Sequence, residues 1–408
     1  MNTLNVPLPS GWKWTKLSDL LIALESGSRP KGGAIGIENG VPSISAEQMT
    51  GRGVFDFSVI SYVPHDFYND MKRGHIQVND ILIVKDGATT GKTCFVDENF
   101  PFKEAVINEH VFICRPNTEL IEPLFLFYWL WGQIGQYQIK SAYQGAAIGG
   151  INQKFTESVV IPLPSLSEQK RIVKILNEQM AAVENARKAV CDNFNTTNIL
   201  SSAYLRNIFS QDNLKRWPKK QFGDIAQIIA KQVNPTLPEY RDLPHVNGEN
   251  IESGTGRLTY LNTAAEELMI SGKYLFPKGS VLYSKLRPYL RKVALVDFDG
   301  VCSADMYPIR VDSNYLRPDF AAWLLLSDEF TNYAVSESQR ARMPKLNRKQ
   351  LFSWEAPLPT LDEQEEMTNK LLLQMKKTTI LNQKIEELVN TIEALPSALL
   401  RKAFRGEV

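Results

Sequence analysis

The stretch DGATTGKT at 86–93 is the first candidate for chemistry in this 408-residue chain. Its last residues, Gly91, Lys92 and Thr93, match the end of a P-loop, which wraps a nucleotide phosphate in successive backbone N–H groups. The pattern also needs a glycine where this sequence has Asp86, and a carboxylate there repels phosphate. Gly87 stands one residue too late. The motif alone leaves nucleotide hydrolysis open.

Other catalytic patterns are missing from the sequence. It has no N/D-P-P-Y/F/W tetrapeptide for a flipped adenine and no F-x-G-x-G loop for a methyl donor; NPTL at 234–237 lacks the aromatic residue. Asp80 and Lys85 could belong to a nuclease site, but charges at strand ends are more often solvated. The four histidines and four cysteines show no zinc-like spacing. We expect no catalytic residue, no bound metal and no cofactor, with the cysteines reduced and buried.

Composition indicates a soluble globular protein of more than one domain. Hydrophobic residues make up 43% of the chain and charged residues 22%, and 408 residues exceed what one hydrophobic core usually holds. No signal peptide opens the chain and no apolar run approaches the roughly 18 residues of a membrane span, so we expect a cytoplasmic protein without a membrane partner. The net charge is only +1, but residues 213–361 carry 20 Lys and Arg against 16 Asp and Glu. Any basic surface is therefore local.

An internal repeat organises the sequence. The segment PLPSLSEQKRIVKIL at 162–176 recurs as PLPTLDEQEEMTNKL at 357–371, and LSSAYLRNIF at 200–209 recurs as LPSALLRKAF at 395–404. Upstream the similarity is weaker but continues, since ILIVK at 81–85 corresponds to VLYSK at 281–285. The chain therefore consists of two copies of one unit, at about 12–209 and 217–404.

Each copy ends in a long predicted helix. Both helices begin with a capping box, Ser165 with Glu168 and Thr360 with Glu363. From there, apolar residues recur at alternating spacings of three and four, which is the seam of a coiled coil. Either each seam packs on its own domain, or the two helices pair with each other; equal length and register favour an antiparallel pair. We expect Pro396 to end or kink the second helix, which leaves about 33 residues, or roughly 50 Å of rod.

The front part of each copy predicts a mixed α and β domain. Short β-type runs at 80–84, 93–96, 281–283 and 292–296 alternate with turn residues, and an amphipathic helix is predicted at 123–139 and at 318–336. In this alignment DGATTGKT lies opposite LRPYLRKV at 286–293, which has no glycine and cannot wrap a phosphate. Both stretches link two predicted strands, whereas a P-loop joins a strand to a helix. We therefore interpret them as basic strand connections.

A second pair of loops also corresponds across the repeat, SAYQGAAIGGINQKF at 141–155 and SESQRARMPKLNRKQ at 336–350. Loops that carry Arg, Lys, Asn and Gln suit DNA, because these side chains hold phosphates and read base edges. Each loop alone could equally be a solvated charged loop; their occurrence at equivalent places in both halves favours DNA. The predicted DNA contacts are basic or amide-bearing loop residues: Lys85, Lys92, Gln144, Lys154, Lys285, Arg287, Arg291, Arg340, Arg342 and Lys345.

The chain resembles the DNA specificity subunits of type I restriction-modification systems. The resemblance covers essentially the whole chain and is carried by the tandem halves, the paired PLP-S/T-L-x-EQ motifs, the closing LLRKAFRGEV at 399–408 and VLYSKLRPYLRKVAL at 281–295. It implies an α+β architecture with two target recognition domains and two antiparallel coiled-coil helices. The divisions are 1–164 and 213–359 for the recognition domains and 165–212 and 360–408 for the helical spacers.

The resemblance also implies a non-catalytic role and a set of partners. Each recognition domain is expected to read one half of a bipartite site in double-stranded DNA, and a rod of roughly 50 Å corresponds to at most about 15 base pairs. Two modification subunits are expected to methylate adenine N6 from S-adenosylmethionine, and restriction subunits to use ATP and Mg. Two other hypotheses stay open at this point, a coiled-coil scaffold without DNA reading and a self-contained DNA methyltransferase or nuclease.

Overall fold

The computed structural model describes residues 8–33, 37, 39–144, 149–338 and 344–408. The chain divides into two compact units: unit 1 contains residues 1–189 and 389–408, and unit 2 contains residues 190–388. Both long helices, α5 (Leu166–Ile208) and α11 (Leu361–Ala403), contribute one part to each unit. A structural unit is therefore not one sequence repeat, because it combines a domain from one repeat with helical segments from both.

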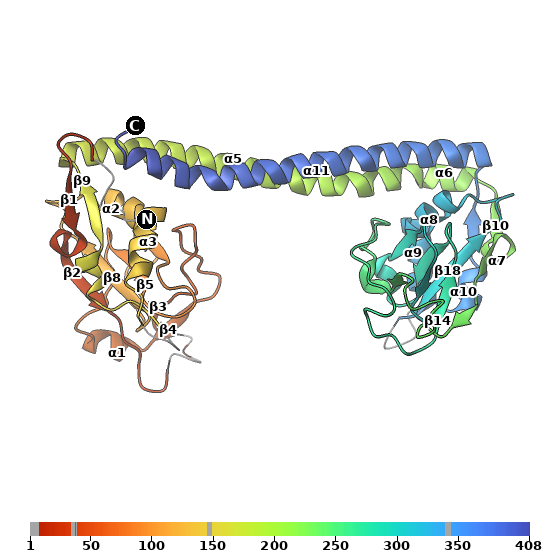
Figure 1. Ribbon diagram of the computed structural model, residues 1–408, viewed down its shortest axis with the longest axis horizontal. Helices are drawn as coiled ribbons and strands as arrows, with labels where there is room; N and C mark the ends of the chain where they lie inside the picture. Colours follow the sequence, from red (N-terminus) through yellow and green to blue (C-terminus); the bar gives the residue numbers. More distant parts are fainter. Residues whose placement is uncertain (1–7, 34–36, 38, 145–148, 339–343) are drawn as a thin grey trace. The chain divides into compact units, whose positions relative to one another are not determined.

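The domain of unit 1 contains a four-stranded sheet, a three-stranded sheet and a strand pair (Figure 1). The four-stranded sheet has the order β2 (Leu21–Ser26), β8 (Val111–Pro116), β5 (Ile81–Val84), β6 (Thr93–Phe95). The other strands are β4 (Ser61–Val63), β3 (Val41–Ile44) and β7 (Val106–Ile107), and the pair β1 (Lys13–Lys16) and β9 (Val160–Leu163). The helices are the 3-10 turn η2 (Leu17–Leu20), α1 (His65–Asp70), α2 (Pro123–Trp131), α3 (Gln133–Ser141) and α4 (Phe155–Ser158).

The domain of unit 2 repeats this plan. Its first sheet has the order β11 (Ala226–Ile228), β18 (Met306–Val311), β15 (Val281–Ser284), β16 (Val293–Leu295), and its second β12 (Gln232–Val233), β14 (Lys273–Phe276), β17 (Gly300–Cys302), β13 (His245–Val246). The strand pair is β10 (Lys219–Gln221) and β19 (Glu355–Pro357). The helices are α6 (Gln211–Arg216), α7 (Phe222–Ile225), η3 (Gly248–Asn250), η4 (Pro288–Leu290), α8 (Pro318–Leu326), α9 (Asp328–Ser338) and α10 (Arg348–Phe352).

The central strand β5 shows why the sequence folds this way. All four of its residues are buried and apolar, and their side chains alternate between the two faces of the sheet. Ile81 and Ile83 enter the core that contains α2 and α3, whereas Leu82 and Val84 enter a smaller core with the second sheet. A strand covered on both faces reads as a continuous apolar run rather than an alternating one.

The amphipathic helix expected at 123–139 is instead two helices. The backbone becomes extended at Gly132, with ψ 159°, and the same break occurs at Ser327 in unit 2, with ψ 158°. The helix before the break is apolar on all sides, since α2 buries nearly every residue, so a single face of the helix does not describe it. The break lets an enclosed helix be followed by one that reaches the surface.

A buried glutamine joins each domain to the start of its long helix. Gln364 accepts a hydrogen bond from the backbone N–H of Arg317 (2.9 Å) and donates to the carbonyl oxygens of Tyr315 and Pro359. Gln169 does the same in unit 1: its Oε1 accepts from the N–H of Glu122 (2.8 Å), and its Nε2 donates to the carbonyl oxygens of Pro164 and Leu120. Both glutamine side chains are fully buried. The repeated Glu-Gln of the sequence motif thus fixes how each helix leaves its domain.

The two capping boxes differ. At Thr360 both reciprocal bonds form, from the Thr360 N–H to the Glu363 carboxylate and from the Glu363 N–H to the Thr360 hydroxyl. At the first helix only the bond from the Glu168 N–H to the Ser165 hydroxyl is present, because the Glu168 carboxylate binds Arg171 one turn further on. The prediction of a complete box at Ser165 was therefore wrong.

The helical segments pair antiparallel within each unit, as predicted. In unit 2 Thr197 donates a hydrogen bond to Asn382 (2.6 Å). Arg216, which lies 19 residues after Thr197, pairs with Glu363, which lies 19 residues before Asn382. In unit 1 Arg171 at the start of α5 donates to the carbonyl oxygen of Val408. Each step forward along one segment matches a step back along the other.

Only half of the predicted seam is buried. Residues one heptad apart in α11, from Leu371 through Thr378 and Ile385 to Ile392, are at most 8% exposed. The alternating seam positions Leu381, Leu388 and Leu395 are 43%, 47% and 38% exposed. The expectation that the whole seam is buried was wrong, because two helices that meet along a single ridge leave the second apolar position uncovered.

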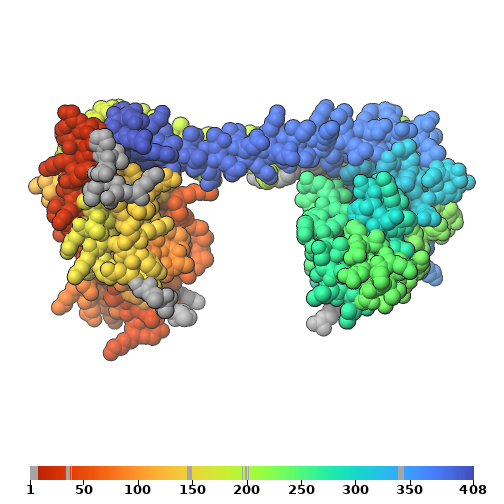
Figure 2. Space-filling model, viewed as in Figure 1, coloured from red at the N-terminus to blue at the C-terminus, as the bar shows by residue number. Residues whose placement is uncertain are grey.

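The second long helix does not end at Pro396 but continues to Ala403, so the expectation of an end there was wrong. The following residues bind it to unit 1: Leu400, Ala403 and Phe404 are buried in the core of this unit, and the Phe404 ring contacts Trp129. The tail then reaches the N-terminal segment, where Gly406 lies against Pro9; Figure 2 shows this dark blue C-terminal surface beside the red N-terminal one. Packing of the last turns outweighs the hydrogen bond that proline removes.

We predict that Gln364→Leu destabilises unit 2. The substitution removes the partner of one N–H and two carbonyl groups; the Pro359 carbonyl is buried, and a buried polar group without a partner costs about 1–3 kcal/mol. Gln383→Leu, at an exposed position of the same helix, serves as the control and changes stability by less than about 0.5 kcal/mol. Urea unfolding followed by tryptophan fluorescence gives both values, and equal stability of the two variants would contradict the role of the glutamine.

Candidate nucleic-acid interface

The structure brings together the two loops that the sequence singled out in each half. In unit 1 an isolated β-bridge joins Asp86 to Gly150, and the N–H of Ile151 donates to the carbonyl of Lys85 (2.7 Å). In unit 2 the matching bridge joins Leu286 to Lys345. We call these pairs the recognition loops: residues 85–93 with 144 and 149–154 in unit 1, and residues 285–293 with 344–349 in unit 2.

The hairpin geometry excludes a P-loop at DGATTGKT. The stretch connects the antiparallel strands β5 and β6 and is not followed by a helix. Three of its backbone N–H groups already have partners within the hairpin: Thr90 donates to the carbonyl of Gly87, Gly91 to that of Val84 and Lys92 to that of Thr89. These three N–H groups are therefore not available to a phosphate. Gly87 and Gly91 serve the turn itself, with φ of +84° and +90°.

Lys85 and Lys285 occupy equivalent places and have partners inside the protein. Lys85 donates to the Ser26 hydroxyl (3.2 Å) and lies 5.5 Å from the Phe112 ring centre. Lys285 donates to the Ala304 carbonyl, pairs with Asp305 (3.4 Å) and lies near the Tyr307 ring. Their predicted DNA contacts stay predictions, and both lysines also hold the base of the recognition loops.

The other predicted contacts of unit 1 spread along the recognition loops. Gln144 is exposed, and its side-chain oxygen accepts from Asn152 (3.1 Å). Lys154 is exposed at the N-terminus of α4, and Lys92 is half-buried. All three belong to the recognition loops of unit 1.

In unit 2 the predicted contacts separate into anchored and open residues. Arg291 is anchored by an ion pair with Asp328 (2.5 Å). Arg287 and Lys345 are exposed. Arg340 and Arg342 lie outside the described residues.

Sequence reasoning missed two exposed groups beside these loops. Tyr289, in the turn between Arg287 and Arg291, is 53% exposed, and His110 lies beside the unit 1 loops with its Nδ1 2.6 Å from the Asp86 carboxylate. The aligned recognition loops could have indicated Tyr289. The contact of His110 could not be read from the sequence, because it joins residues 24 positions apart.

Asp80 is not a solvated strand-end charge. It is fully buried and accepts two hydrogen bonds from the Arg115 guanidinium, at 2.8 and 2.9 Å. Burial raises the pKa of Asp80, against the lowering effect of Arg115. Since Asp80 and Arg115 bind each other rather than an open cleft, the nuclease interpretation has no support at this position.

The cysteines are partly as expected. Cys94, Cys114 and Cys302 are free and buried, and burial raises the pKa of Cys94 and of Cys302 to about 12. Cys191 is exposed on α5, so the expectation that all four are buried was wrong. The described residues contain no group of three or more His, Cys, Asp or Glu placed to hold a metal.

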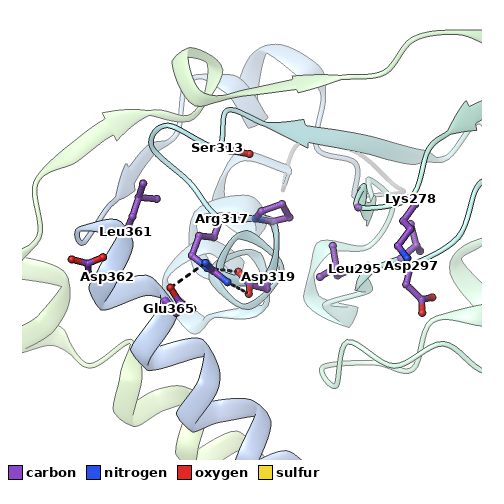
Figure 3. A pocket seen from close by; sticks show the side chains of 12 residues that line it. Lys278, Leu295, Asp297, Ser313, Arg317, Asp319, Leu361, Asp362 and Glu365 are labelled. Atoms are coloured by element: carbon purple, nitrogen blue, oxygen red, sulfur yellow. Dashed lines mark hydrogen bonds and ion pairs between the residues drawn. The ribbon is translucent and has the colours of Figure 1, made fainter.

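A cavity of about 580 Å³ in unit 2 lies away from the recognition loops, beside the starts of α8 and α11 (Figure 3). Arg317 stands in it between Asp319 (2.9 Å) and Glu365 (3.5 Å). Arg317 thereby joins the domain to its helix, because Asp319 belongs to α8 and Glu365 to α11. We assign this cavity no part in the interface.

Comparison with known proteins identifies the family. The family model described as type I restriction modification DNA specificity domain matches residues 9–190 and again residues 215–390. The chain belongs to this family. It is 29% identical over 330 residues to the type I restriction enzyme EcoDI specificity subunit of Escherichia coli. The aligned region covers 71% of this chain and 72% of that protein. The StySPI specificity subunit of Salmonella potsdam is 22% identical over 98% of this chain and 90% of its own length.

Solved structures share the fold of this specificity subunit. The HsdS subunit from Thermoanaerobacter tengcongensis aligns over the whole of both chains with a TM-score of 0.62 and 20% identity. A chain from work on complex assembly and conformational transition of the type I R-M system aligns over 99% of this chain and all of its own, with a TM-score of 0.75 and 19% identity.

Family membership gives the protein its function. It is a non-catalytic DNA sequence-specificity subunit. Its partners are of the class that such subunits bind: DNA, and the modification and restriction subunits of a type I system. No helix in the described part of the chain is long and apolar enough to cross a membrane.

We predict that acid destabilises unit 2 through His245. This residue is 2% exposed, its Nδ1 lies 2.7 Å from the Glu267 carboxylate, and its buried Nε2 has no partner among the described residues. Burial lowers the pKa of His245, although Glu267 opposes this. The unfolded chain therefore binds the proton first, and stability is lost as pH falls below about 6.5.

Thermal unfolding between pH 7.5 and pH 5.5 tests this prediction. His245→Asn is the comparison, because the asparagine amide can still donate to Glu267 but does not titrate. We expect the unfolding midpoint of the wild type to fall more steeply than that of the variant. Parallel curves would show that His245 does not carry the pH dependence.

Proposed function

We propose that each unit reads one half of a bipartite DNA site through its recognition loops, and that the paired helices set the gap between the halves. The observation that carries this proposal is the duplicated arrangement of the loops. Each unit presents two loops from distant parts of the sequence, joined by the same β-bridge at the same end of the same sheet. Arginine, lysine and amide side chains on such loops suit phosphates and base edges.

The proposal includes partners and a location for the reaction. Two modification subunits methylate adenine N6 from S-adenosylmethionine, and restriction subunits supply the chemistry that uses ATP and Mg. This chain needs no cofactor of its own and acts in the cytoplasm. Its part is to hold the modification subunits beside the adenines of the target.

The uncovered seam positions are the proposed docking surface for the modification subunits. Leu381 and Leu388 follow each other at heptad spacing on the unit 2 part of α11 and are 43% and 47% exposed. Leucines at this spacing bury themselves when further helices pack beside a helix pair. The corresponding positions of α5, Ala186 and Asn193, are also exposed, but Asn193 is polar.

Exchange of one domain tests the assignment of half-sites. The unit 2 domain begins and ends in the neighbouring strands β10 and β19, so residues 219–357 can be replaced by the matching segment of a relative with another target. We expect one half of the split methylated motif to change, while the other half and the gap stay the same. Sequencing of methylated adenines in the host provides the result, and a change in both halves or in neither would contradict the proposal.

Docking is tested by the double variant Leu381→Glu, Leu388→Glu. Because both side chains are exposed, we expect the chain to fold normally and to lose co-purification with the modification subunit. The matched control is Gln383→Glu, Asn390→Glu, which adds two negative charges at the same spacing on another exposed face. If both double variants retain the partner, the stripe is not the docking surface.

A further inference from the structure

The recognition loops of the two units share an unusual backbone geometry. In unit 1 Gly87 and Gly91 have φ of +84° and +90°. At the equivalent places in unit 2 the residues are Arg287 and Arg291, with φ of +49° and +47°. Both pairs lie in hairpins that join equivalent strands, β5 to β6 and β15 to β16. Positive φ therefore recurs at both places, once with glycines and once with arginines.

Arginine is a poor choice for this backbone conformation. A residue with a Cβ atom crowds the following carbonyl oxygen in the left-handed region, whereas glycine does not. Within the described part of the chain only Asn79, Leu268 and these two arginines adopt positive φ without being glycine. Residues kept in such conformations are concentrated at functional sites.

Contacts within unit 2 account for Arg291. Its guanidinium pairs with Asp328, which also meets Arg206 of α5 (3.4 Å), and its carbonyl accepts from the Gly254 N–H (3.1 Å). Arg291 thus ties the turn to α9 and α5. Its side chain has a structural use that offsets the conformational cost.

No such contact accounts for Arg287. Its side chain is exposed and forms no ion pair or side-chain hydrogen bond with any residue the structure describes. Its backbone is nevertheless fixed, because its N–H donates to the Pro344 carbonyl (2.8 Å) and its carbonyl accepts from Leu290 (2.9 Å). The neighbouring Leu286 is bridged to Lys345. A rigid backbone therefore presents an open guanidinium.

We infer that Arg287 reads a base edge, that of a guanine in the major groove, in the half-site of unit 2; this rests on the proposed function. An arginine donates two parallel hydrogen bonds to the O6 and N7 of guanine, and this contact requires a fixed direction of approach. A phosphate contact requires only a positive charge within reach, and a flexible residue in a relaxed conformation supplies that. Gly87 has no side chain, so unit 1 reads its half-site with other residues.

The test uses the complete complex with modification subunits, once its methylated motif is known. Arg287→Lys keeps the charge but removes the planar fork, and Arg287→Gly removes the side chain and suits the left-handed backbone. We expect both to relax one G·C position of the unit 2 half-site, with about ten- to a hundred-fold less discrimination there. The other positions, the other half-site and the salt dependence stay the same, and the thermal midpoint of Arg287→Gly does not fall.

Three results would overturn the inference. Uniformly weaker binding to all sequences, with a salt slope smaller by about one, would make Arg287 a phosphate contact. A lower thermal midpoint in Arg287→Gly would make its side chain structural. An unchanged motif in both variants would remove it from the interface. Failure of the proposed function is distinct from all three, because the wild-type complex would then show no split motif.

Discussion

The buried glutamine at the start of each long helix is the contact on which the rest of the architecture depends. The Gln169 and Gln364 amides bond backbone groups of the preceding strand exit and of the loop before the apolar helix of the domain. One side chain in each unit thus joins the loop before the apolar helix to the run that leads from the strand into the long helix. The direction in which a helix leaves its domain is thereby fixed, and so is the placement of that domain's recognition loops relative to its own helical segment.

From this junction the arrangement of each unit follows. The apolar helix packs on one face of the four-stranded sheet, and the second sheet covers the other face, so the central strand is buried on both sides. The hairpin that continues from this strand emerges at the edge of the sheet, where it meets the second loop through the β-bridge. Because the sequence motif with the glutamine occurs twice, the same construction is made twice and two loop pairs result.

The sequence predicted the features that recur in both halves. The repeat, the hairpins at 81–95 and 281–295, the pairing of the long helices and the family could all be found by comparing the chain with itself and with a known pattern. The features it did not predict depend on long-range contacts. Burial of Asp80 requires Arg115, 35 residues away, and continuation of α11 through Pro396 requires the core of unit 1, where Phe404 packs.

The exposed half of the seam illustrates the same limit. A heptad pattern shows that the two alternating positions of a seam are apolar. It does not show whether one partner helix or several cover them. The recognition loops show the opposite case, in which a sequence difference becomes meaningful only with the backbone in view. Glycine at 87 and arginine at 287 are unrelated residue types, yet both have a positive φ at equivalent places. Stability favours glycine there, so the arginine points to function.

Methylome sequencing of a host that expresses this chain with an active modification subunit tests the central claim most directly. The comparison is the same host without the chain. The account predicts methylated adenines in a split motif, two short half-sites with a fixed gap, only when both proteins are present. Absence of a split motif with the modification subunit active, or methylation that persists when that subunit is removed, would contradict it.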